Sequence, residues 1–402
     1  MRTSARWVIL LLVGLTLTNC KNSGNDPVIQ PANPSTLVSN RLLGTFTQTQ
    51  LRERISGLGQ QIDPFVTLLV QREIQAYRIV YKTKNTDNTD INASGILLVP
   101  KPLSGETFPL VSQQHGTIFD ESQSPSYFAS TSEAGTIGAL FASSGYIVSF
   151  PDYIGYGESK GVPHPYLHRQ TEASASLDML RAAREFISTN KIGWNNRTML
   201  TGYSQGGHAT MSLLKLMEDQ FPTEFTLVAA SCGAGPYNVE GFMQDLVNTT
   251  THGISQYNNL YVWVLQTYNR VYGLNRPMSF YFKNPYAADV QANGTRSNIR
   301  VSINTAFTDA FRTGLNSGSD ADFLKAVRDN NVFDWKPKTP LQLYHGNADN
   351  QVFYRNSTDA LAAMKARAAT DVTLFTAQGK DHGPAIEDYL LGTFQFFNSK
   401  RQ

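Results

Sequence analysis

The pentapeptide Gly202-Tyr203-Ser204-Gln205-Gly206 holds a serine between two glycines, each two positions away. The apolar run Thr198-Met199-Leu200 precedes it and a helix-like run over residues 209–217 follows, which predicts a strand, a sharp turn and a helix. A serine on such a turn projects out of the sheet with strained backbone angles. The residues two positions before and after this serine must be small, because larger side chains there would clash with the adjoining strand or helix. We therefore interpret Ser204 as a candidate nucleophile, which requires a base, an acid and hydrogen-bond donors from elsewhere in the chain.

The composition of the chain is that of a globular protein. Of its 402 residues, 41% are hydrophobic and 16% are charged. The net charge of +2 gives no reason to expect nucleic acid as a partner. The length allows two or three domains, and it equally allows one α/β enzyme with a large insertion.

The N-terminus predicts export. Arg2 and Arg6 precede an apolar run over residues 7–17, which is too short to span a bilayer as a stable helix, so we expect a signal peptide over residues 1–19. The ending Leu17-Thr18-Asn19-Cys20 resembles a bacterial lipobox, which implies that Cys20 is lipidated and becomes the mature N-terminus. Acyl chains on Cys20 would anchor the protein in the bacterial envelope without a transmembrane helix.

The alternative for Cys20 is ordinary secretion with an incidental cysteine. We favour lipidation because Cys20 stands at the end of the apolar run and only one other cysteine, Cys232, occurs. Cys232 itself is expected to be a small buried hydrophobic residue beside a strand.

The chain divides into a tether, a catalytic domain and an insertion. Residues 20–40 are expected to be a flexible tether, since Asn, Ser, Pro and Gly are frequent there. The catalytic domain is expected over residues 41–235 and 336–402, and it opens with an N-terminal extension over residues 42–70 that is helical in patches. Residues 236–335 are expected to form a helical cap, because the segment is too long for a structureless loop.

Strands and helices alternate through most of the catalytic domain. Residues 74–82 and 93–99 predict an antiparallel pair that opens the sheet. Further strands are expected at residues 109–114, 146–150, 225–230, 341–346 and 372–376, and helices at 136–142, 172–187, 359–368 and 385–397. This alternation predicts an α/β fold with a mostly parallel sheet and helices on both of its faces.

Four helical pieces are expected in the cap, at residues 242–246, 260–272, 299–311 and 320–329. The cap is rich in Tyr and Phe and contains Trp263. These aromatic side chains form either the core of the cap, which we favour for most of them, or an apolar wall for a substrate.

An acid and a histidine follow two later strands. In a sheet-based hydrolase the chain order is nucleophile, acid and histidine, on loops at the carboxyl ends of strands. Asp349 follows the strand at 341–346 and His382 follows the strand at 372–376, so we expect His382 to act as the base and Asp349 to orient it.

The competing residues fit this order less well. Asp371 precedes its strand, and Asp381 adjoins His382 in sequence, where facing side chains are hard to arrange. The other histidines either precede every acid that follows Ser204 or, in one case, lie on the turn of the acid: His115, His164, His168, His208, His252 and His345.

The oxyanion of a tetrahedral intermediate needs N–H donors that are already in place. One should be the amide of Gln205 at the start of a helix, where the helix dipole assists. The second is expected from the loop His115-Gly116-Thr117, with the Thr117 N–H favoured and the Gly116 N–H next. We expect His115 to be structural.

No metal or other cofactor is expected. The acidic and imidazole side chains of Asp152, Glu158, His164 and His168 have a spacing that matches no metal-ligand motif.

Together these residues give the chain a resemblance to the α/β-hydrolase superfamily from about residue 74 to the C-terminus, and most of all to bacterial lipases and esterases with a large cap, related to the secretory lipases. The resemblance implies Ser204, Asp349 and His382 as a catalytic triad and a cap inserted after the sixth strand, where residues 236–335 fall. The motifs that carry it are His115-Gly116-Thr117, Asp152-Tyr153-Ile154-Gly155-Tyr156-Gly157-Glu158-Ser159, Gly202-Tyr203-Ser204-Gln205-Gly206-Gly207-His208, His345-Gly346-Asn347-Ala348-Asp349 and Asp381-His382-Gly383.

The sequence therefore predicts an exported serine hydrolase that acts on small-molecule or lipid esters. The same triad would also serve a peptidase or an acyltransferase, and a non-catalytic surface binding protein is a further alternative. No oligomeric state follows from the sequence.

Overall fold

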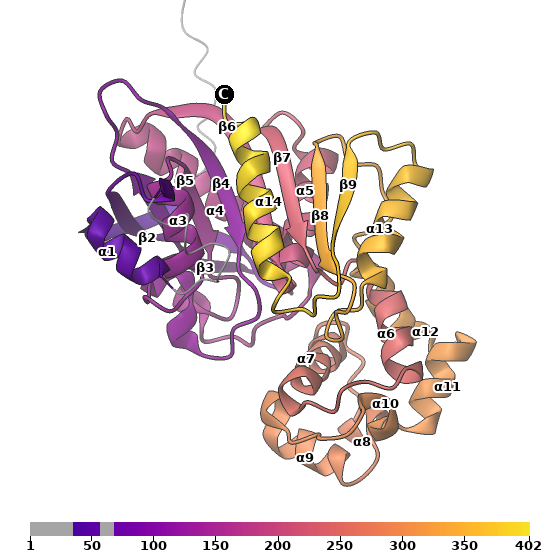
Figure 1. Cartoon of the computed structure of the whole chain (residues 1–402). Coiled ribbons are helices and arrows are strands. Elements are labelled where there is room, and N and C mark those ends of the chain that lie inside the picture. The colour runs from indigo at the N-terminus through magenta and orange to yellow at the C-terminus, as the bar shows by residue number, and fades with distance from the viewer. Residues whose placement is uncertain (1–34, 57–67) are drawn as a thin grey trace, which may run out of the picture. The chain divides into compact units, whose positions relative to one another are not determined.

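The computed structural model describes residues 35–56 and 68–402, and within them nine strands form one sheet (Figure 1). The expected signal peptide, Cys20 and the tether as far as residue 34 lie outside the described residues. The strands are β1 (Leu37–Phe46), β2 (Ile74–Lys84), β3 (Asp90–Pro100), β4 (Phe108–Gln114), β5 (Ile147–Pro151), β6 (Trp194–Tyr203), β7 (Thr226–Gly233), β8 (Leu341–Gly346) and β9 (Val372–Ala377).

The order of the strands across the sheet is β1-β2-β3-β5-β4-β6-β7-β8-β9. The pairs β1–β2, β2–β3 and β3–β5 are antiparallel. The remaining strands, in the order β5, β4, β6, β7, β8 and β9, run parallel to one another. The predicted mostly parallel α/β sheet and its opening antiparallel pair are thereby confirmed. β6 lies inside the parallel part, so its carboxyl end is flanked by β4 and β7.

The first strand corrects two expectations. Residues 37–40, expected as the end of the tether, and residues 42–46, expected in a helical patch, belong to β1, which pairs with β2. The carboxylate of Glu185 accepts the backbone N–H groups of Thr36 and Leu37, which holds the start of the strand. The sequence of this segment does not reveal the strand, because its hydrogen-bond partners lie on another segment of the chain.

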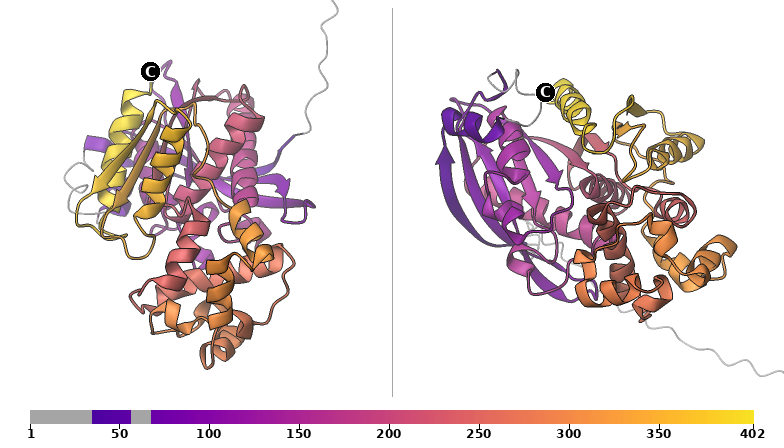
Figure 2. Two further views of the ribbon diagram at one scale, coloured as in Figure 1. Left: turned by 90° about the vertical axis from the view of Figure 1, so that its right-hand side faces the viewer. Right: turned by 60° about the horizontal axis from the view of Figure 1, so that its bottom comes forward.

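Helices pack on both faces of the sheet (Figures 1 and 2). α4 (Arg169–Thr189), α5 (Gln205–Gln220) and α13 (Arg355–Ala366) contribute to the apolar core on one face. α1 (Gln48–Ile55), α3 (Ala139–Ser143) and α14 (Ile386–Ser399) contribute to the core on the other.

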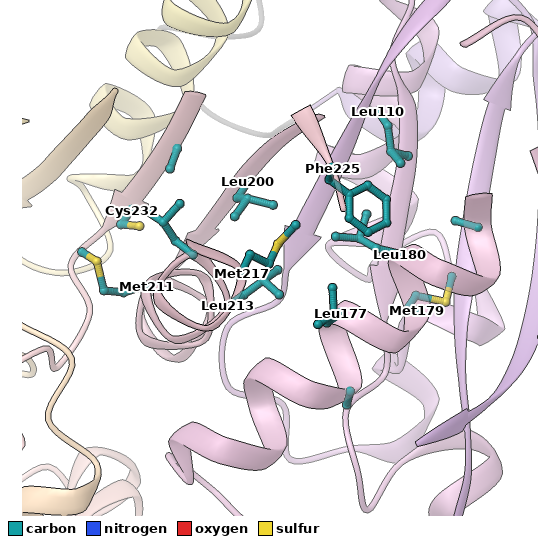
Figure 3. Packing of buried hydrophobic residues seen from close by; sticks show 14 of the residues in the cluster. Leu110, Leu177, Met179, Leu180, Leu200, Met211, Leu213, Met217, Phe225 and Cys232 are labelled. Atoms are coloured by element: carbon teal, nitrogen blue, oxygen red, sulfur yellow. The ribbon is translucent and has the colours of Figure 1, made fainter. Parts of the chain in front are cut away.

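Figure 3 shows the first of these cores, where Leu177 and Leu180 of α4 and Met217 of α5 lie near Leu200 of β6. Burial of each such side chain stabilises the fold by roughly 1.5–3 kcal/mol relative to exposure. Cys232 of β7 is a free, fully buried member of the same core, as expected.

The chain between β7 and β8 is helical and lies beyond one end of the sheet, where it is drawn in salmon to orange (Figures 1 and 2). Its helices are α6 (Val239–Asn248), α7 (Ser255–Val271), α8 (Met278–Tyr281), α9 (Tyr286–Asn293), α10 (Ile303–Ala306), α11 (Asp309–Ser317) and α12 (Ala321–Asp329). We call these residues, 239–329, the helical insertion. Most of its aromatic side chains pack in a core of its own, as favoured from the sequence.

The expectation of a single helix over residues 299–311 of the insertion is wrong. Residues 299–311 form α10 and the start of α11, and the chain is extended between them at Phe307, which bridges to Phe282. The Thr308 hydroxyl accepts the N–H of Phe311 and caps α11, so a new helix starts there.

Within residues 35–56 and 68–402, none of the helices has the length and apolar character needed to cross a membrane.

Candidate active site

Ser204 stands between β6 and α5 with φ 60° and ψ −121°, a conformation with positive φ that costs about 1–3 kcal/mol for a residue other than glycine. Its backbone N–H donates to Gly233 O on β7 (2.9 Å), which helps to hold the turn. A Cβ atom on Gly202 would lie 2.3 Å from Gly206 O, and one on Gly206 would lie 2.1 Å from Gln114 O. The two glycines are therefore required by close backbone approach, as expected from the pentapeptide.

His382, on the loop after β9, lies beside this serine. Its Nε2 is 2.9 Å from Ser204 Oγ, and its Nδ1 is 2.6 Å from Asp349 Oδ2. Asp349 lies on the turn after β8. The fold thus brings together three residues that the sequence placed far apart, in the order serine, histidine and acid.

Asp349 is held from both of its oxygens. Its Oδ1 accepts the backbone N–H groups of Gln351 (2.9 Å) and Val352 (2.8 Å). Burial by itself would raise the pKa of Asp349, but hydrogen bonds from His345 and His382 and the charge of these rings hold it well below its ordinary value. The carboxylate therefore stays ionised across the neutral range and can orient His382.

The competing acids have other contacts. The Asp381 carboxylate accepts the backbone N–H groups of Asn350 (3.0 Å) and His382 (2.7 Å), so it ties the two loops together rather than contacting the imidazole. Asp371 precedes β9, and its carbonyl accepts the N–H of Leu341 at the start of β8, the edge of the sheet opposite Asp349.

His345 is a partner of the acid that sequence reasoning missed. Its ring is fully buried, with Nε2 3.1 Å from Asp349 Oδ2 and 2.8 Å from Val352 O, and Nδ1 2.7 Å from Ser357 Oγ. The signal in the sequence is the spacing of four positions between His345 and Asp349, which places both residues on one turn.

The three expected oxyanion donors differ in their availability. Within the described part of the chain, the backbone N–H groups of Gln205 and Thr117 have no hydrogen-bond partner. The Gly116 N–H, the second candidate on its loop, donates to Glu133 Oε1 (2.9 Å) and is therefore already engaged. This leaves Gln205 and Thr117 as the pair that fits the role.

The side chain of Gln205 fixes the start of α5. Burial lowers the pKa of His164 to about 4, so this ring is neutral. His164 Nδ1 then donates to Ile154 O (2.6 Å), and His164 Nε2 accepts from Gln205 Nε2 (2.8 Å). The same amide nitrogen donates to Glu172 Oε1 (3.0 Å), so the residue expected to supply an oxyanion donor is held at its side chain as well.

Glu133 is a second residue that the sequence did not indicate. It directly precedes the π-helical turn η3 (Ala134–Gly138), and it lies close to Ser204 in the fold although 71 positions separate them in the chain. Burial raises the pKa of its carboxyl to about 7, and the hydrogen bond from the Gly116 N–H offsets part of that rise.

The residues considered for a metal have separate partners. Asp152 accepts from Ser94 Oγ (2.5 Å) and Ser126 N–H (2.7 Å), while Glu158 pairs with Arg78 at 2.8 Å. In the parts of the chain that the structure describes, no group of three or more His, Cys, Asp or Glu side chains is arranged to bind a metal ion.

A cavity of about 310 Å³ opens at Ser204 and His382. Its wall is mostly apolar with a few polar groups, as is usual for sites that bind small organic molecules. The residues that line it besides the serine and histidine are Gln113, Gln114, Gly116, Thr117, Phe119, Glu133, Ile137, Gly202, Tyr203, Gln256, Tyr257, Leu260, Gln351, Ile386 and Tyr389.

Comparison with solved structures gives the same fold. The chain superimposes on the rice cell wall degrading esterase LipA from Xanthomonas oryzae with a TM-score of 0.77 at 24% identity, over 91% of this chain and 99% of LipA. A protein from Legionella pneumophila aligns with a TM-score of 0.79 at 24% identity, over 91% and 98% of the two chains. Candida antarctica lipase A aligns with a TM-score of 0.61 at 15% identity, over 89% and 82%.

At such low identity these structures establish the α/β-hydrolase fold alone. A search of curated protein sequences found no match. The model of the secretory lipase family (LIP) matches residues 127–383, which is more than half of the chain and includes Ser204, Asp349 and His382. By this match, the chain belongs to the secretory lipase family.

Proposed function

We propose that this protein is a serine hydrolase that cleaves carboxylic esters through an acyl-enzyme intermediate. The observation that carries the proposal is the unbroken line of short contacts from Ser204 Oγ to His382 (2.9 Å) and from His382 to the Asp349 carboxylate (2.6 Å). Membership of the secretory lipase family supports an ester as the substrate.

In the first half of the reaction, Ser204 Oγ attacks the carbonyl carbon of the ester while His382 Nε2 takes the serine proton. Asp349 stabilises the imidazolium that forms. The N–H groups of Gln205 and Thr117 donate to the oxyanion of the tetrahedral intermediate. The bond between the carbonyl carbon and the alcohol oxygen then breaks, and the alcohol leaves with the proton from His382.

In the second half, a water molecule attacks the acyl group on Ser204 and gives a proton to His382 Nε2. Collapse of the second intermediate releases the carboxylic acid, and the proton returns to Ser204 Oγ. No cofactor enters either half.

The test compares Ser204→Ala with the parent chain on p-nitrophenyl esters and on an aminoacyl anilide. We expect kcat for the esters to fall by about 10⁴-fold or more, because a triad member acts as part of a unit. The matched control is Ser188→Ala at the exposed end of α4, which should retain the parent activity. Ester cleavage that survives Ser204→Ala would refute the mechanism, and cleavage of the anilide alone would indicate a peptidase.

We further propose that the protein is exported and anchored through a lipid on Cys20, with the helical insertion as a cap over the site. Support for the anchor comes from the apolar leader that ends at Cys20. Cells fed labelled palmitate should label the parent chain and leave Cys20→Ala unlabelled; label that persists in the variant would refute the anchor.

A further inference from the structure

Two cavities meet at Ser204. The first is the cavity of about 310 Å³ described above, which includes His382. The second has a volume of about 20 Å³ and extends from Ser204 and Gln205 toward the helical insertion. Leu260 and Gln351 lie in the wall of both, so the two cavities share a boundary.

The position of His382 decides which part of an ester each cavity receives. In the proposed reaction the alcohol oxygen must take a proton from His382 Nε2, so the alcohol has to lie on the side of the serine where that ring stands. His382 lines the large cavity and not the small one. The alcohol therefore belongs in the large cavity, and the acyl chain extends into the small one.

The small cavity has room for one water-sized group, since about 10–15 Å³ is the least volume that holds a water molecule. Its wall is almost entirely apolar and includes Leu167, Pro236, Phe242 and Val264. Phe242 packs against Tyr261 (ring centres 5.8 Å apart), within the core of the insertion. On the side of the insertion the wall is thus backed by close-packed side chains, so a methyl group fits there more readily than a longer acyl chain, which would have to displace them.

The large cavity suits a bulkier group with hydroxyls. Glu133 Oε1 is engaged by the Gly116 N–H, while Glu133 Oε2 has no partner among the residues that the structure describes and can form a hydrogen bond with a hydroxyl of a bound alcohol. The side-chain amide of Gln256 adds a donor and an acceptor. Phe119 is half exposed, and the centre of its ring lies 5.5 Å from the centre of the Trp263 ring. It supplies an aromatic surface at this cavity.

We propose that the protein is selective for esters of short acyl chains, acetyl above all, with large alcohols that carry hydroxyl groups. This inference rests on the proposed ester hydrolysis and adds which side of the ester is selected for size.

The first test measures kcat/KM of the full chain for p-nitrophenyl acetate, butyrate and octanoate. We expect a fall of at least about 10-fold from acetate to octanoate, the effect of one or more excess methylenes at a narrow apolar pocket. Equal rates on acetate and octanoate would overturn the inference and leave ester hydrolysis intact. Absence of cleavage of all three esters would instead refute the proposed function.

The second test enlarges each cavity separately. Val264→Ala and, as an independent variant, Phe242→Leu widen the small cavity alone, so each should raise the ratio of octanoate to acetate cleavage by about 10-fold. Ile386→Ala is the matched variant of the large cavity. It should change the preference between 2-naphthyl acetate and methyl acetate and leave the acyl-chain ratio as it was. A shift of the acyl-chain ratio in Ile386→Ala, with none in Val264→Ala, would show that the acyl chain occupies the large cavity.

Discussion

His345 contributes to the site only through another residue. Its Nε2 lies between Asp349 Oδ2 and Val352 O, and its Nδ1 is held by the Ser357 hydroxyl, so the ring sets the rotation of the acid that in turn orients His382. A carboxylate that turned away would leave the base free to rotate. In the proposed mechanism His345 is therefore a positioning residue.

Replacement of His345 tests this role. We expect His345→Ala to lower kcat by about 10²-fold with KM unchanged, because the base is misplaced while substrate binding is not. His345→Gln keeps an N–H donor for Asp349 and should restore most of kcat, which repair of packing alone would not do. Full activity of His345→Ala, or equal loss in both variants, would contradict the positioning role.

The pKa of Glu133 is raised to about 7 in the fold, against about 4.3 in an unfolded chain, so the free energy of unfolding should depend on pH. The folded state holds this proton more tightly than the unfolded state, so the contribution of Glu133 to stability is present below about pH 4 and lost as the pH rises through 7. The loss is on the order of 3 kcal/mol.

Glu133→Gln should therefore gain melting temperature relative to the parent chain between pH 5 and pH 8. The amide oxygen can still accept the Gly116 N–H, and Glu53→Gln on the exposed surface of α1 is the matched control for the loss of one carboxyl. A melting-temperature difference that is constant with pH would count against a protonated Glu133.

The turn between β6 and α5 tolerates no side chain at its glycines. Gly206→Ala would place a Cβ 2.1 Å from Gln114 O, a backbone atom of β4 that cannot move aside without shifting the strand. We expect this change to lower the free energy of unfolding by about 1–3 kcal/mol or more, measured by urea denaturation. Gly161→Ala, where no atom lies within 4 Å of the new Cβ, should have little effect. Equal stability of the two variants would mean that the turn can relax.

A buried network connects α5, the helix that follows Ser204, to the helical insertion. Glu172 of α4 accepts from Gln205 Nε2 and lies 2.7 Å from His208 Nδ1, and His208 Nε2 lies 3.0 Å from Asn330 O at the end of α12. The Glu172 and His208 side chains are at most 1% exposed. The network therefore joins the start of α5 to the point where the insertion returns to the sheet.

Removal of Glu172 would leave these buried donors without their acceptor. We expect Glu172→Ala to lower the free energy of unfolding by about 3–5 kcal/mol, as is found when one partner of a buried pair is lost. Asp90→Ala breaks the exposed pair between Asp90 and Lys84 and should change stability little. An effect of Glu172→Ala no larger than that of the control would show that the network does not hold the insertion in place.

Much of the fold could be predicted because each parallel strand is buried and ends at a recognisable turn. β8 has the bounds expected from the sequence, and β4, β5, β7 and β9 differ from the expected ranges by a few residues at most. The exceptions depend on distant partners. β1 takes its hydrogen bonds from β2, and the break between α10 and α11 accompanies the bridge from Phe307 to Phe282.

The sequence by itself determined the parallel sheet, the turn at Ser204 and the meeting of Asp349 and His382 beside it. These follow from local patterns, because parallel strands bring all their carboxyl ends to one edge whatever lies between them. Only the tertiary structure decided that Glu133 engages the Gly116 N–H, that His345 supports Asp349, and that a large and a small cavity meet at Ser204. Those features arise from side chains on different elements, and no short-range pattern in a sequence specifies how such side chains pack together.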